Sequence, residues 1–191
     1  MSVIPWLIAI PLTAFVMGSW RRYIPLIFKK RSRKLFDRML CLASASRFMI
    51  WHAVLESREE TESRDLANKR AGDIVRWILN DPETYIDMKN PQWPYTRNEA
   101  MAWLNANPDW RELVLQTMKV EFIAKNEENT SDQDFNRLIA SPVFQVYGHD
   151  YPIKTDPQAY KNLVMRMLNR SPDMVKDVVR QKFAFPGAMD L

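Results

Sequence analysis

The N-terminal part of the chain changes abruptly from an uncharged segment to a strongly basic one. Residues 3–20 contain no charged side chain, whereas residues 21–38 contain eight basic residues and one acid, Asp37. An uncharged apolar run of about 18 residues or more can cross the roughly 30 Å hydrocarbon layer of a membrane as a helix. The sequence therefore predicts a transmembrane anchor at residues 1–20, a basic juxtamembrane collar at residues 21–38 and a separate domain at residues 39–191.

The aromatic and proline residues of the uncharged segment suit a helix that crosses a membrane. Trp6 and Trp20 lie near its two ends and Tyr23 follows just beyond, and such side chains favour the membrane–water interface. Pro11 lies in the middle and predicts a kink, which transmembrane helices tolerate. The alternative is an apolar arm that is buried or docked on a partner. The predicted anchor and interface residues are Trp6, Pro11, Trp20, Arg21, Arg22 and Tyr23.

The basic residues predict the orientation of the chain. No Lys or Arg precedes the uncharged run, and the basic residues follow it. Because cytoplasmic loops carry the excess of Lys and Arg, we expect a single-pass protein with its N-terminus outside and its C-terminal domain on the cytosolic, or matrix-like, side. Basic residues beside a membrane gain roughly 1 kcal/mol each from anionic lipid headgroups. The residues predicted to face these headgroups are Lys29, Lys30, Arg31, Arg33 and Lys34.

The charge of the remaining chain argues against a nucleic-acid-binding surface. The whole chain carries a net charge of +4, of which residues 21–38 contribute +7, so that residues 39–191 carry −3. A domain that binds nucleic acid shows a clustered basic face instead. We therefore expect no nucleic acid among the partners of this protein.

The C-terminal domain is predicted to be all-α. Glycine is scarce, with four in the whole chain, and no Asn-Gly or Asp-Gly hairpin signal occurs. Five times, a residue that caps helix N-termini is followed directly by proline, which is favoured at the first helical position. These pairs are Asp81-Pro82, Asn107-Pro108, Ser141-Pro142, Asp156-Pro157 and Ser171-Pro172.

Apolar residues at helical spacing complete a map of helices and loops. Between Glu56 and Asp65 the sequence contains neither Gly nor Pro, so that a turn and a continuous helix are both compatible with it. Beyond the anchor, the predicted helices cover residues 32–58, 62–80, 82–88, 97–106, 108–125, 132–140, 142–147, 157–169 and 172–183. The predicted loops cover residues 89–96, 126–131 and 148–155. The apolar stripes include Leu66, Ile74, Ile78, Trp110, Leu113, Tyr160, Leu163, Met174 and Val175.

No constellation of residues predicts catalysis, a cofactor or a metal ion. Four scattered glycines exclude the phosphate-binding loop and the dinucleotide fingerprint. Cys41, the only cysteine, lies eleven residues from His52, too far for a hydrogen bond along one helix. We interpret Cys41 as a packed thiol, with palmitoylation as the alternative. His52 and Glu56 have i, i+4 spacing, which supplies at most half of a metal site, so that a surface hydrogen bond is the simpler interpretation.

A proline-bounded segment supplies the predicted docking residues. Trp93 and Tyr95 lie in the sequence Asn90-Pro-Gln-Trp-Pro-Tyr95, within the predicted loop at residues 89–96. Aromatic side chains are enriched in protein–protein contacts, and Trp93 and Tyr95 are therefore predicted to dock a partner. The alternative is that Trp93 covers the core of its own domain.

Three of the helix starts resemble one another. They are Asn107-Pro-Asp, Asp156-Pro-Gln and Ser171-Pro-Asp. Helices that begin in this way and carry Met-containing stripes are similar to those of co-chaperone modules, which cradle hydrophobic segments in a helical groove. The similarity is confined to the C-terminal part of the chain and would imply a substrate adaptor.

These features predict a non-enzymatic, membrane-anchored helical subunit of a larger membrane protein complex, with a structural, assembly or docking role. Its expected partners are other subunits of that complex and anionic lipid headgroups. One alternative is a membrane-tethered co-chaperone or substrate adaptor with a Met-rich hydrophobic groove, since the chain contains eleven Met. The other alternative is an enzyme that uses carboxylates scattered in the sequence. An adaptor is expected to expose an apolar groove, and a structural subunit to bury such a surface against its neighbours.

Overall fold

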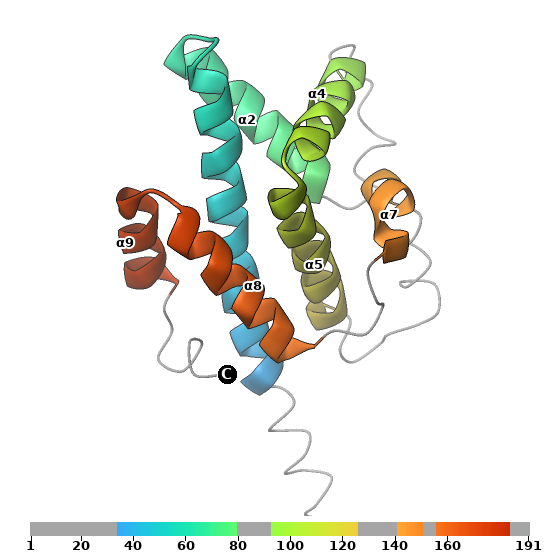
Figure 1. Cartoon of the computed structure of the whole chain (residues 1–191), viewed down its shortest axis with the longest axis vertical. Helices are drawn as coiled ribbons and strands as arrows, with labels where there is room; N and C mark the ends of the chain where they lie inside the picture. The colour runs from blue at the N-terminus through green and yellow to red at the C-terminus, as the bar shows by residue number, and fades with distance from the viewer. Residues whose placement is uncertain (1–33, 80–92, 126–140, 151–155, 184–191) are drawn as a thin grey trace, which may run out of the picture. The chain divides into compact units, whose positions relative to one another are not determined.

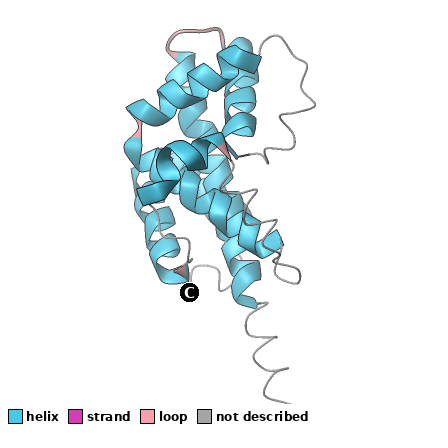
Figure 2. Ribbon diagram, turned by 90° about the vertical axis from the view of Figure 1, so that its right-hand side faces the viewer, coloured by secondary structure: helices cyan, strands magenta, loops and turns pink. Residues whose placement is uncertain are grey.

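The structure, a computed structural model, describes residues 34–79, 93–125, 141–150 and 156–183 (Figures 1 and 2). Every element in these ranges is a helix and none is a strand, which confirms the all-α prediction. In chain order the elements are a helix at residues 34–59, α2 (Arg64–Leu79), α4 (Trp93–Ala106), α5 (Pro108–Lys125), α7 (Pro142–Tyr147), the 3-10 helix η1 (Gly148–Asp150), α8 (Pro157–Arg170) and α9 (Asp173–Lys182).

The chain divides into two units, Met1–Asp37 and Arg38–Leu191. Beyond its first residues, the helix at residues 34–59 belongs to the second unit, as do all later elements. Within the described ranges no helix is both long and apolar enough to cross a membrane. The predicted anchor at residues 1–20 and most of the basic collar lie outside the described residues, so that both stay predictions.

Helix α5 lies in the interior of the second unit. It packs against α2, α4, α7 and α8, and eight of the nine residues from Leu113 to Glu121 are buried. A surface helix buries one apolar stripe, whereas burial around the whole circumference marks a core helix. The sequence predicted only the stripe, because Lys119 and Glu121 interrupt the apolar pattern.

The helix at residues 34–59 buries one face along most of its length. Met39, Leu42, Ser46, Ile50 and Val54 recur at spacings of three and four residues, and each is at most 2% exposed. This spacing places all five side chains on one side of a helix. This buried face therefore contributes to the core along most of the length of the helix.

Four charged side chains link the end of this helix to α2 and α4. Glu99 Oε1 accepts from Arg58 Nη2 at 3.0 Å and from Arg70 Nη1 at 2.6 Å. Glu62 Oε1 accepts from Arg58 Nη2 at 2.9 Å and lies 3.5 Å from Arg70 Nε. Each carboxylate thus contacts both guanidinium groups. We call these four residues the Arg58 network.

The Arg58 network accompanies a turn that the sequence left open. The helix ends at residue 59, and the backbone N–H groups of Thr61 and Glu62 both donate to the carbonyl of Arg58 at 3.0 Å. Helix α2 begins shortly afterwards, at Arg64. The segment therefore turns without Gly or Pro, and the ion pairs around Glu62 stabilise the turn.

Four of the five proline pairs stand at helix boundaries in the described residues, but their side chains serve different helices, and Asp81-Pro82 lies outside the described residues. Asp156 Oδ1 accepts from the backbone N–H groups two and three residues later, at 2.9 and 3.3 Å, and so caps α8. Asn107 Nδ2 and Ser171 Oγ instead donate to carbonyl groups four residues earlier, at 2.9 and 3.0 Å. These two side chains complete the preceding helices. Ser141 stands before α7 without a side-chain capping bond.

The structure corrects three details of the predicted map. Helix α4 begins at Trp93, so that the predicted loop at residues 89–96 is wrong for its last four residues. Residues 148–150 form a 3-10 helix where a loop was expected. Leu66 is 43% exposed and Met174 is 60% exposed, so that neither belongs to the buried part of its stripe.

Candidate functional site

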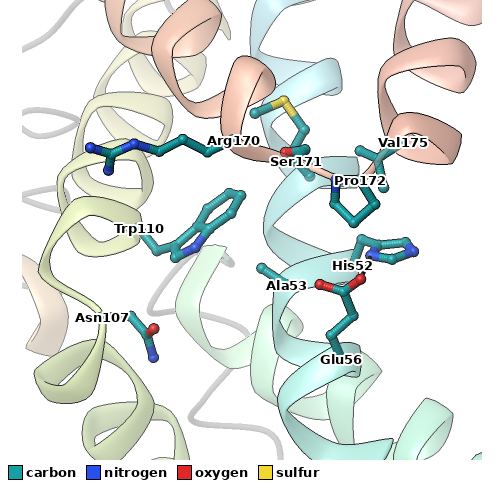
Figure 3. A pocket seen from close by; sticks show the side chains of 10 residues that line it. His52, Ala53, Glu56, Asn107, Trp110, Arg170, Ser171, Pro172 and Val175 are labelled. Atoms are coloured by element: carbon teal, nitrogen blue, oxygen red, sulfur yellow. Dashed lines mark ion pairs between the residues drawn. The ribbon is translucent and has the colours of Figure 1, made fainter.

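A pocket of about 260 Å³ opens between the helix at residues 34–59, the start of α5 and the junction of α8 with α9 (Figure 3). Sites for cofactors and drug-sized ligands measure about 300–1,000 Å³. The pocket is therefore suited to a group of about the size of an amino-acid side chain. We call it the α5–α8 pocket.

One wall of the α5–α8 pocket carries His52 and Glu56. Nδ1 of His52 lies 3.4 Å from Oε1 of Glu56, but this nitrogen has no hydrogen-bond partner among the described residues. The imidazole side chain is 12% exposed and the carboxylate side chain 49% exposed. The two groups are thus neighbours without a hydrogen bond, and the oxygens of Glu56 keep their capacity to accept one.

The opposite wall carries Asn107 and Trp110 (Figure 3). Because the Asn107 Nδ2 group donates to a carbonyl of the preceding helix, its Oδ1 remains an acceptor. The Trp110 ring is half-buried. Arg170 reaches across from the end of α8, and its guanidinium group pairs with the carboxylate of Asp109. In Figure 3 this guanidinium points away from Glu56, and Arg170 is the one Arg among the described residues that line the pocket.

Three buried hydroxyl groups join the helices around the pocket. The Tyr160 Oη lies 3.1 Å from Ser46 Oγ and 3.1 Å from Thr117 Oγ1. The exposed fractions of the three residues are 2%, 0% and 0%. Burial raises the pKa of Tyr160 to about 12. At neutral pH this hydroxyl is therefore protonated, and it holds α8, α5 and the helix at residues 34–59 together as a hydrogen-bonding group and not as a base.

Two charged residues of α5, Lys119 and Glu121, are also buried. Glu121 accepts two hydrogen bonds from the guanidinium of Arg47, which also donates to the carbonyl of Leu79 at 3.1 Å. Lys119 is 1% exposed, and burial lowers the pKa of its ammonium group. Lys119, Glu121 and Arg47 were not predicted as site residues from the sequence, because single charges within helices are usually solvated. The signal that could have found them is an apolar run on both sides of each charge.

The structure describes only some of the predicted site residues. The anchor residues from Trp6 to Tyr23 and the collar residues from Lys29 to Arg33 lie outside the described ranges. Lys34 is exposed at the first described position of its helix, and Cys41, about two turns further along, is half-buried.

The predicted docking residues require a correction of their backbone. Trp93 and Tyr95 stand in the first turn of α4 and not in a loop, because Pro94 between them is compatible with the first turn of a helix. Their side chains are not among those described. Their role in docking stays a prediction.

Nothing in the described ranges assembles a metal site. No group of three or more His, Cys, Asp or Glu side chains gathers there. His52 and Glu56 do lie together, as their spacing indicated, but no third ligand joins them in the described part of the chain. The pocket offers hydrogen-bond acceptors and an aromatic surface, which are means of binding.

Known proteins provide no comparison for this arrangement. A scan against models of protein families, a search of curated proteins and a search of solved structures each found no match.

Proposed function

We propose that this protein is a membrane-tethered, non-catalytic helical subunit that docks a partner protein beside a membrane. The observation that carries the proposal is the junction in the sequence between eighteen uncharged residues and eighteen residues that contain eight basic ones. A membrane helix followed by a polybasic segment accounts for both halves of this junction.

The first described helix supports the proposal because it belongs to the core of the helical unit. Its described part runs from residue 34, within the predicted collar, to residue 59. Ser46 and Arg47, on this same helix, bond to α8 and α5. The helix that follows the predicted collar in the sequence is therefore held within the core of the helical unit by side-chain hydrogen bonds.

The described surface favours docking of a specific partner over the adaptor alternative. A co-chaperone would need a continuous apolar groove for varied substrates. Among the described residues, the large hydrophobic side chains that are exposed are Leu66, Val146 and Met174, and they belong to α2, α7 and α9. Isolated apolar residues of this kind are usual on protein surfaces. The polar α5–α8 pocket is the better candidate for recognition.

The proposal is tested by the size of the assembly that contains the full chain. The chain is released from its native membranes with a mild detergent and separated by size under native conditions. We expect it in a complex of defined composition, well above the 22.6 kDa of the chain itself. A chain that leaves the membrane alone, as a detergent-bound monomer, would contradict the docking role.

A further inference from the structure

We infer that the α5–α8 pocket receives an arginine side chain of the partner protein. This inference rests on the proposed function for the existence of a partner, and on the pocket for the chemistry of the group that it binds. The volume of about 260 Å³ limits the occupant to something smaller than a nucleotide or another common cofactor. A single long side chain meets this limit.

The free polar groups of the pocket accept hydrogen bonds from two directions. On one side the Glu56 carboxylate lies 3.4 Å from His52 Nδ1 without a hydrogen bond to it, and on the other side the Asn107 Oδ1 remains an acceptor. A ligand that binds both groups must carry hydrogen-bond donors that point in two directions. A guanidinium group has five N–H donors in a planar fork and can bind a carboxylate with two of them.

The charges of the pocket favour a cation. Glu56 contributes a negative charge, and the positive charge of Arg170 is balanced by Asp109, with which it pairs. The carboxylate of Glu56 thus has no Lys or Arg partner among the described residues that line the pocket, and it favours a cation over a carboxylate or phosphate group.

The aromatic wall favours arginine over lysine. Trp110 lines the pocket opposite the helix that carries Glu56 (Figure 3). Tryptophan is the best aromatic partner for a cation, and arginine stacks on its face more often than lysine does. The combination of one carboxylate, one amide oxygen and one indole face thus selects a planar donor with a positive charge.

Binding is measured by NMR on the full chain in detergent, with the indole N–H signal of Trp110 as the reporter. The probe is a five-residue peptide, acetyl-Gly-Ser-Arg-Ser-Gly-amide, whose only charge is the guanidinium group. Peptides with Lys, citrulline or Glu at the same position are the comparisons. We expect saturable binding in the millimolar range for Arg, at least threefold weaker binding for Lys, and at least tenfold weaker binding for citrulline and Glu.

Two variants assign the binding to this pocket. Glu56→Gln is expected to weaken the binding of the Arg peptide at least fivefold, whereas Glu60→Gln, in the turn that follows the same helix and not among the residues that line the pocket, leaves it unchanged. Equal binding of the Arg and citrulline peptides, or equal loss in the two variants, would overturn the inference. So would free arginine binding far more tightly than the peptide, because that result would indicate a small-molecule site.

The failure of this inference can be told apart from the failure of the proposed function. A chain that assembles with partners but ignores the Arg peptide keeps the docking role and loses the arginine pocket. A chain that binds the peptide but is a monomer in its membranes keeps the pocket chemistry and loses the docking role, and with it the partner as the source of the arginine.

Discussion

At the scale of single residues, Tyr160 connects three helices through one hydroxyl group. Replacing it by Phe leaves the buried hydroxyls of Ser46 and Thr117 without this partner. A buried polar group that loses its partner costs about 1–3 kcal/mol. We therefore expect Tyr160→Phe to lower the free energy of unfolding of the full chain by about that amount at pH 7, as measured by urea denaturation in detergent.

The same variant predicts a difference at high pH. Because the pKa of Tyr160 is about 12 in the folded chain and 10.0 in the reference state, its contribution is complete below pH 10 and disappears as the pH rises through 12. Two pKa units correspond to roughly 2–3 kcal/mol. The parent should therefore lose more stability than Tyr160→Phe between pH 10 and pH 12. If the free energies of unfolding of the parent and of Tyr160→Phe fell in parallel with pH, the hydroxyl would have the same pKa in the folded and unfolded states.

A side chain at position 148 is expected to overpack the region around Phe144. A Cβ atom at this position would lie 2.8 Å from Cγ of the Phe144 ring, and Phe144 is only 6% exposed. We expect Gly148→Ala to reduce stability by about 1–3 kcal/mol, as forced insertions into packed regions do. Gly72→Ala is the matched control, because a Cβ there meets nothing within 4 Å. In the helix α2, that change should stabilise by about 0.5–1 kcal/mol. Equal effects at the two glycines would contradict the packing around Phe144.

At the scale of elements, the Arg58 network is expected to matter more than the exposed ion pairs. Glu99→Gln removes a charge that contacts two guanidinium groups, in side chains that are 21%, 25% and 42% exposed for Arg58, Glu99 and Arg70. Loss of one partner of a fully buried pair costs about 3–5 kcal/mol, and partial exposure reduces this to an expected 1–2 kcal/mol. Arg166→Gln, which breaks an exposed pair with Glu112, is expected to cost less than about 1 kcal/mol.

Thermal or urea unfolding of both variants at low and high salt measures this difference. Salt screens exposed charges more strongly than buried ones, so that the smaller effect of Arg166→Gln should vanish first. A larger loss of unfolding free energy for Arg166→Gln than for Glu99→Gln would show that the exposed α5–α8 ion pair stabilises the fold more than the Arg58 network does.

Helix ends and helix type were predictable from the sequence, whereas the polar contacts between helices were not. The Asp156-Pro157 pair predicts a local event, the capping of one helix start, and the structure confirms it. Proline similarly locates the starts of α5 and α7. The pairing of Arg58 with Glu99 joins residues 41 positions apart, and that of Ser46 with Tyr160 joins residues 114 apart. Such contacts depend on tertiary packing, which no local pattern encodes.

The α5–α8 pocket shows the same limit. His52 and Glu56 were recognisable as neighbours, because i, i+4 residues share a helix face. Their meeting with Trp110 and Arg170 follows from the packing of the helix at residues 34–59 against α5 and α8. The predicted loop at residues 89–96 was wrong at its end for a local reason, since the proline-bounded segment was expected to be a loop but Pro94 stands in the first turn of α4.

At the scale of the whole molecule, the charge asymmetry around the uncharged segment predicts a single orientation. The helical unit should lie on the side of the membrane that carries the collar, which is cytosolic or matrix-like. In sealed vesicles with this side inside, added protease should leave residues 39–191 intact until detergent opens the vesicles. Digestion of the helical unit in vesicles that are still sealed would indicate the opposite orientation.

The central claim, that the chain is tethered to a membrane through residues 3–20, is tested most directly by extraction of native membranes with alkaline carbonate. This treatment removes peripheral proteins and leaves proteins with a membrane-spanning helix in the pellet. We predict that the full chain stays in the pellet, and that a variant lacking residues 3–20 is released although its collar and helical unit are unchanged. Release of the full chain by carbonate, to the same extent as the deletion variant, would contradict the tether.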